Sequence, residues 1–112
     1  MIEVRINYEG NYIVSFQVQG HAGFAPRGED IYCAGVSAVA QTTLLGLLKN
    51  LNAEPEYHIE EGWLECRLPA ELDREDMDKA QIILSTMEAG MLTMHEAYGD
   101  FIKLEVRRSQ NV

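Results

Sequence analysis

This chain of 112 residues has few cysteines and few basic residues, and it lacks several motifs, so whole classes of function are disfavoured. Two cysteines without a CxxC motif argue against a thioredoxin-like dithiol and against a tetrahedral metal site. No GxxxxGK[ST] phosphate loop is found, and no segment approaches the ~18 uninterrupted apolar residues of a membrane span. Nine basic against 18 acidic residues disfavour a nucleic-acid-binding surface. We therefore expect no metal or other cofactor, no direct nucleic-acid binding and no membrane partner.

The composition otherwise fits one folded domain over residues 1–112. Apolar residues make up 46% of the chain, and low-complexity runs are missing. The first residues alternate like a strand and have no signal-peptide layout, which predicts a cytoplasmic protein whose cysteines are thiols rather than a bridge. The net charge of −9 would suit a basic protein partner through electrostatic steering.

The hydrophobic pattern predicts seven elements in the order β-β-α-β-β-α-β. Alternation of apolar residues favours two hairpins and a final strand, and helical periodicity favours two helices that begin after Asp30 and Asp73. The expected strands are residues 2–8, 12–18, 56–60, 63–68 and 101–106, the helices end near Asn50 and Tyr98, and residues 107–110 are expected to fray. The prediction is an α+β fold, with two helices packed on a mostly antiparallel or mixed sheet.

The richest chemistry lies between residues 20 and 35. Cys33 falls in the first turn of a long apolar helix, where backbone N–H groups favour a reactive thiolate. Asp30 is placed to cap this helix and to accept the N–H of Cys33. His21 stands across a loop made flexible by glycines, from which it can exchange a proton with the thiol. Those loop glycines are Gly20, Gly23 and Gly28.

Other candidate residues have plainer interpretations. Cys66 shares a strand face with two leucines and is expected to be a buried apolar residue. His58 is expected to be solvated, and His95 to interact favourably with a helix C-terminus. Ser37 lies one turn beyond Cys33, where it can bond near the thiol or to its own helix. The methionines of the second helix follow one face and favour a place in the core.

The motif around residues 20–38 resembles that of a known family, the bacterial ribosomal-processing cysteine proteases called Prp. The matching residues are Gly20-His21-Ala22, then Gly28-x-Asp30-Ile31-x-Cys33-Ala34, then Val36-Ser37-Ala38. The length and element order are also similar to that family, so the resemblance covers essentially the whole chain. Tyr32 stands where a smaller aliphatic residue is expected, and Phe24 where tyrosine is frequent.

The resemblance implies a homodimeric cysteine endopeptidase that supports bacterial ribosome assembly. Its expected substrate is a basic protein, ribosomal large-subunit protein twenty-seven, from which it removes a short hydrophobic N-terminal extension. The resemblance also implies that Cys33 is the nucleophile and His21 the base and acid, with Asp30 and Ser37 in supporting roles. Backbone N–H groups around Cys33 and Ala34 are candidates for holding the oxyanion. Two other functions stay open: a non-enzymatic, ribosome-associated docking dimer and a redox-sensing thiol protein.

Overall fold

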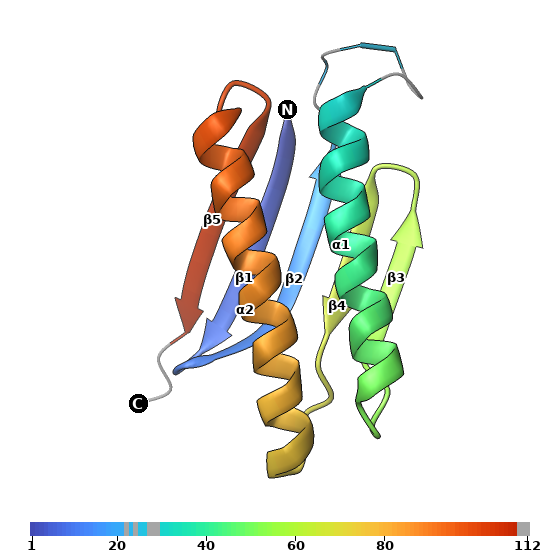
Figure 1. Cartoon of the computed structure of the whole chain (residues 1–112), viewed down its shortest axis with the longest axis vertical. Coiled ribbons are helices and arrows are strands. Elements are labelled where there is room, and N and C mark those ends of the chain that lie inside the picture. Colours follow the sequence, from blue (N-terminus) through green and yellow to red (C-terminus); the bar gives the residue numbers. More distant parts are fainter. Residues whose placement is uncertain (22, 24, 27–29, 110–112) are drawn as a thin grey trace.

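In the computed structural model, which describes residues 1–21, 23, 25–26 and 30–109, one five-stranded sheet carries two helices on one face (Figure 1). The elements are β1 (Ile2–Glu9), β2 (Tyr12–Gly20), α1 (Ile31–Asn50), β3 (Glu56–Glu60), β4 (Trp63–Arg67), α2 (Arg74–Ala97) and β5 (Ile102–Ser109). Their order is the predicted β-β-α-β-β-α-β, and the α+β class is confirmed.

The sheet is mixed, with the strand order β3-β4-β2-β1-β5. The pairs β1–β2, β2–β4 and β3–β4 are antiparallel, whereas β1 and β5 run parallel. Ile2 at the start of β1 faces Gly20 at the end of β2, and the N–H of Gly20 donates to the carbonyl of Gly62 at 3.0 Å. The end of β2, the start of β1 and the β3–β4 turn therefore meet at one end of the sheet.

The core lies between the sheet and the helical layer. The alternating pattern of β1 buries Ile2, Val4 and Ile6, whose side chains are at most 2% exposed. The helices contribute Val36, Ala40, Leu44 and Leu47 from α1 and Ala80, Leu84, Met87 and Met91 from α2. The predicted burial of the methionine face is confirmed for Met87 and Met91. Each large side chain buried in this way stabilises the fold by roughly 1.5–3 kcal/mol.

Both predicted N-caps are present. The Asp30 carboxylate accepts the backbone N–H groups of Tyr32 at 3.0 Å and Cys33 at 3.1 Å, and Asp73 accepts that of Asp76 at 2.8 Å. Each cap satisfies N–H groups that have no partner within the helix. The first turn of α1 is therefore ordered by its own sequence.

The side chain of Asp76, three residues after the Asp73 cap, bonds to a segment outside α2. It is buried and accepts the N–H groups of Asn52 at 2.9 Å and Ala53 at 3.1 Å. This carboxylate therefore holds the turn that follows α1, a contact between segments that local spacing does not reveal.

The prediction of a frayed tail was wrong for residues 107–109, whereas Gln110 lies outside the described residues. The last strand continues to Ser109 because β1 offers a parallel partner along its whole length, up to the pair of Glu9 with Ser109. The carbonyl of Ser109 accepts the N–H of Gly10 at 3.2 Å. The Arg108 guanidinium also lies 4.1 Å from the centroid of the Tyr8 ring, a cation–π contact.

By length and composition alone, α1 is apolar enough to cross a membrane. The core helix of a globular protein passes the same test. In this fold one face of α1 is buried in the core, through Val36, Ala40, Thr43, Leu44 and Leu47.

Candidate active site

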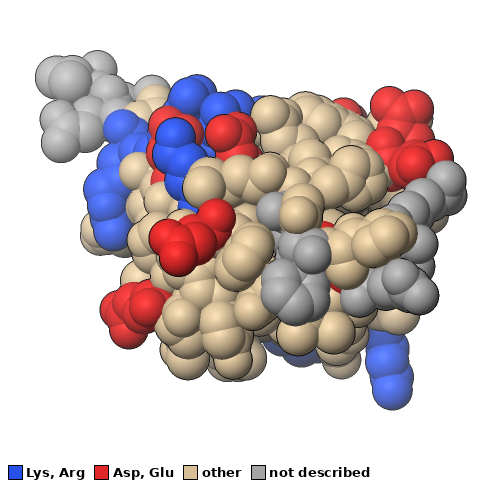
Figure 2. Space-filling view, turned by 90° about the horizontal axis from the view of Figure 1, so that it is seen from above, with Lys and Arg blue, Asp and Glu red and all other residues tan. Residues whose placement is uncertain are grey.

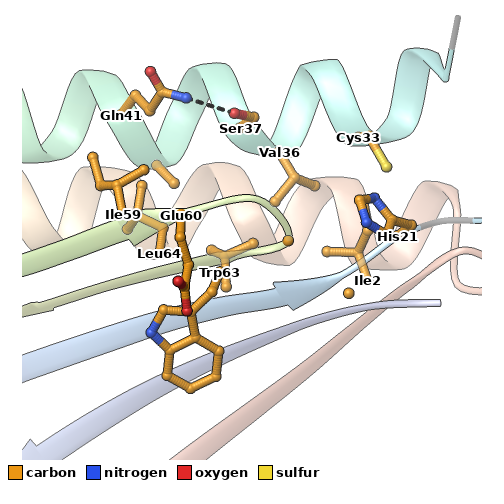
Figure 3. A pocket seen from close by; sticks show the side chains of 14 residues that line it. Ile2, His21, Cys33, Val36, Ser37, Gln41, Ile59, Glu60, Trp63 and Leu64 are labelled. Carbon is orange, nitrogen blue, oxygen red and sulfur yellow. Dashed lines mark hydrogen bonds between the residues drawn. The ribbon is translucent and has the colours of Figure 1, made fainter. Parts of the chain in front are cut away.

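The predicted cysteine and histidine meet at the end of the sheet where α1 begins. His21 follows directly on β2, Cys33 lies in the first turn of α1, and both line one cleft of about 170 Å³. Figure 3 shows the Cys33 side chain directed toward the His21 ring. Cys33 is half-buried and His21 exposed, so the thiol is held by the fold while the imidazole stays open to a substrate. The arrangement suits a nucleophile with an adjacent base.

The position of Cys33 follows from the helix cap. Its N–H donates to the carboxylate of Asp30, which is only 6% exposed, and the N–H of Ala34 donates to the Asp30 carbonyl at 3.0 Å. The two N–H groups predicted to hold an oxyanion are therefore engaged by Asp30 in this structure. An oxyanion bound at the N–H of Cys33 would compete with the Asp30 carboxylate for it.

The position of His21 follows from two glycines with positive φ. At Gly20, where φ is +88°, a Cβ would lie 2.7 Å from the carbonyl oxygen of Met1. Only glycine therefore leaves room for the backbone of Met1 at this position. At Gly62, where φ is +73°, a Cβ would lie 3.3 Å from Nε2 of His21. The imidazole therefore packs against the β3–β4 turn.

Gly62 was not predicted as a site residue, because the hairpin pattern of the sequence identifies it only as a turn glycine. No local signal connects it to His21. The connection depends on the pairing of Gln19 with Trp63, which brings the β3–β4 turn beside the end of β2.

The walls of the cleft come from α1 and from the β3–β4 hairpin (Figure 3). Ile59 pairs with Leu64 across the hairpin, and these two side chains face the helices. Val36 and Ala40 of α1 complete an apolar wall. At about 170 Å³ the cleft is smaller than the ~300–1,000 Å³ of pockets that enclose drug-sized ligands, so it suits part of an extended chain.

Ser37 lies in the same cleft, on the face of α1 that carries Cys33, as predicted. Its hydroxyl accepts a hydrogen bond from the side-chain amide of Gln41 at 2.8 Å, a partner that the sequence interpretation did not name. This pair places polar groups at the exposed rim of an otherwise apolar wall (Figure 3). Of the predicted loop glycines, Gly20 and Gly23 have positive φ, and Gly28 lies outside the described residues.

A second cysteine and histidine, Cys66 and His58, do not form a comparable pair. Cys66 pairs with Tyr57 and points into the core, whereas His58 is exposed and lies 3.6 Å from the Glu60 carboxylate. Burial raises the pKa of the Cys66 thiol to about 12. The predictions of a buried Cys66 and a solvated His58 are confirmed, and Cys66 is a free thiol.

His95 lies in the last turn of α2, as predicted, and has a further partner that the sequence did not indicate. Its Nδ1 lies 2.8 Å from the carbonyl oxygen of Ile102, which ties the last turn of α2 to β5. Within the part of the chain that the structure describes, no three His, Cys, Asp or Glu side chains gather as metal ligands.

Charged side chains are mixed rather than separated at the end of the molecule that Figure 2 shows. Most of the Lys and Arg side chains in view gather at one margin with acidic side chains among them, and uncharged residues lie between the charged groups. Along β1 and β5, Glu3 stands opposite Lys103 and Arg5 opposite Glu105, with 3.6 Å between Nε of Arg5 and the Glu105 carboxylate. Part of the charge is therefore neutralised locally on this strand pair.

Solved structures with the same fold include two of a protease from Staphylococcus aureus. The crystal structure of its essential ribosomal processing protease Prp with a covalently linked product peptide has a TM-score of 0.83 and 28% identity, over 95% of this chain and 99% of that chain. The structure of that protease with a substrate peptide has a TM-score of 0.78, again at 28% identity and with the same coverage.

Curated relatives agree with these structures. The ribosomal processing cysteine protease Prp of Bacillus subtilis is 34% identical over 94 residues, which are 82% of this chain and 84% of that protein. The protein of the same name from Staphylococcus aureus is 27% identical over 106 residues, 95% of this chain and 97% of that protein. The family model of the cysteine protease Prp matches residues 1–103. This chain therefore belongs to the Prp family of cysteine proteases.

Proposed function

We propose that this protein is a ribosomal-processing endopeptidase in which Cys33 is the nucleophile and His21 the general base and acid. The observation that carries the proposal is that Cys33 and His21 line one cleft, with the thiol directed toward the imidazole. The relatives named as ribosomal processing cysteine proteases support it, as does the covalently linked product peptide of the Staphylococcus aureus enzyme.

In the first half of the reaction, His21 takes the proton of Cys33 and the sulfur attacks the scissile carbonyl carbon. The C–N bond of the resulting tetrahedral intermediate breaks, and the imidazolium returns the proton to the leaving amine. The acyl group then remains on Cys33 as a thioester.

In the second half, His21 takes a proton from water, whose oxygen attacks the thioester. The C–S bond breaks, and the proton returns to sulfur.

The proposed substrate is the N-terminal extension of a basic ribosomal protein, large-subunit protein twenty-seven. Val36, Ala40, Ile59 and Leu64 offer the cleft's apolar wall to apolar side chains of such an extension. Ser37 and Gln41 at the rim stand where peptide polar groups would pass. The net charge of −9 favours the approach of a basic protein. Because this attraction is electrostatic, the rate of association should fall when salt is added.

We further propose that the enzyme works in the cytoplasm as a homodimer. Large apolar side chains of the helical layer are exposed, among them Leu45 of α1 and Ile82 of α2 at 63% and 68%, and a second copy would shield such a surface. Light scattering at micromolar concentration tests the dimer, and a monomeric mass would contradict it.

The test of the proposed function is cleavage of the ribosomal protein with its extension, read as the mass of the product. One defined cut is expected from the wild type and none from Cys33→Ala or His21→Ala. Cys66→Ala is the matched control and should cut at the wild-type rate, because Cys66 lies in the core. Full turnover by Cys33→Ala would overturn the proposal.

A further inference from the structure

An aromatic cluster joins the first turn of α1 to the turn between α2 and β5. Tyr32, the residue directly before Cys33, stacks on Phe101 with ring centroids 4.5 Å apart and an interplanar angle of 9°. Tyr98 tilts against the same Tyr32 ring, with centroids 5.1 Å apart and an angle of 57°. Tyr32, Tyr98 and Phe101 are called the aromatic cluster below.

Backbone hydrogen bonds fix two members of the aromatic cluster, Tyr98 and Phe101. The N–H of Phe101 donates to the carbonyl of Tyr98 at 3.0 Å, which closes the turn after α2. The carbonyl of Phe101 accepts the N–H of Ile2 at 2.9 Å, which ties this turn to the start of β1. The residue on whose ring Tyr32 stacks is therefore tied through its backbone to the start of β1.

The same strand end leads to His21. Ile2 pairs with Gly20 across β1 and β2, and Gly20 directly precedes His21. The N–H of Gly20 also donates to the carbonyl of Gly62 at 3.0 Å. Tyr32 is thus connected to His21 by a series of contacts through Phe101, Ile2 and Gly20.

We propose that Tyr32 is a positioning residue, whose stacking on Phe101 sets the place of the Cys33 sulfur relative to His21. The Asp30 cap orders the first turn of α1 within the helix, whereas Tyr32 connects that turn to the strands that carry His21. The inference rests on the proposed roles of Cys33 and His21. Displacement of reacting groups by about 1 Å can cost up to ~100-fold in rate, so loss of the stack should reduce catalysis more than binding.

The experiment compares Tyr32→Phe, Tyr32→Leu and Tyr32→Ala in cleavage of the extended ribosomal protein. Tyr32→Phe keeps the ring and should retain kcat within about twofold. Tyr32→Leu and Tyr32→Ala should lower kcat by ~10- to 100-fold while KM changes less than about threefold. The rate of Cys33 alkylation by iodoacetamide at neutral pH should fall in the same two variants and recover in Tyr32→Phe.

Tyr8→Ala is the matched control, because Tyr8 is also a part-buried aromatic residue with defined contacts, to Glu88 and Arg108, near the other end of β1. It should lower the free energy of unfolding and leave kcat unchanged. A folded Tyr32→Leu with wild-type kcat and alkylation rate would overturn the inference, even if Tyr32→Ala did not fold. Cleavage by Cys33→Ala would instead overturn the proposed function, so the two failures are distinguishable.

Discussion

The imidazole of His21 packs against the backbone of Gly62, in the turn between β3 and β4. A methyl group at Gly62 would lie 3.3 Å from Nε2 of His21, closer than most carbon contacts in folded proteins. The proposed base is therefore held from one side by a hairpin turn, while Cys33 approaches it from α1. The β3–β4 hairpin thus has two roles, since it supports His21 and also forms a wall of the cleft.

We expect Gly62→Ala to lower turnover as well as stability. The positive φ of Gly62 should cost about 1–2 kcal/mol with any side chain, and the new methyl should also displace the His21 ring. Gly10→Ala is the control, because Gly10 has a φ of +59° in the β1–β2 turn and no heavy atom within 4 Å of an added Cβ. Denaturant unfolding should show similar losses of unfolding free energy for both variants, whereas kcat should fall only in Gly62→Ala. Equal kcat values would contradict a positioning contact at Gly62.

The two cysteines should differ strongly in their reaction with iodoacetamide. Cys33 lines the cleft, whereas Cys66 is 2% exposed and its raised pKa of about 12 keeps it a thiol at neutral pH. Native protein should therefore be labelled at Cys33 well before Cys66, and the two rates should converge in denaturant. Peptide mapping by mass spectrometry reads both sites, and equal slow labelling in the native state would favour a structural role for Cys33.

Stability should fall at alkaline pH because of Cys66. Its folded-state pKa of about 12 lies above the ordinary thiol value of 9.0, so the folded state holds the proton more tightly than the unfolded state. The free energy of unfolding is then unaffected by this group below about pH 9 and decreases as the pH rises from 9 toward 12. Urea unfolding at pH 8 and pH 10.5 should show a smaller decrease for Cys66→Ala than for the wild type. An identical decrease would mean that other groups are responsible.

Loss of the Asp30 cap should affect both stability and turnover. Asp30→Ala removes the acceptor for the N–H groups of Tyr32 and Cys33, at a cost of about 1 kcal/mol in unfolding free energy, and loosens the turn that holds the sulfur. Asp30→Asn should keep most of the stability, because asparagine is also a good cap. Asp73→Ala removes the corresponding cap of α2 and should destabilise to a similar extent with unchanged kcat. A wild-type kcat in Asp30→Ala would show that the cap serves stability alone.

Features that depend on neighbouring residues were predictable from the sequence. Alternation in β1 places Ile2, Val4 and Ile6 on one buried face because successive strand residues point to opposite sides. The caps at Asp30 and Asp73 were predictable for a similar reason, since a cap bonds to N–H groups only two or three residues away. The Cys–His hypothesis also began from local chemistry at the start of α1.

Features that depend on distant residues could be found only in the tertiary structure. The continuation of β5 to Ser109 requires β1 as a partner, and the role of Asp76 requires the turn after α1. Composition and periodicity by themselves determined the order of elements, the buried faces and the place of Cys33 in a helix start, because these follow from bonding and geometry within a few residues. Only the packed sheet decided that Gly62 supports His21 and that Phe101 supports Tyr32, because strand pairing and ring stacking join segments that are far apart in the chain.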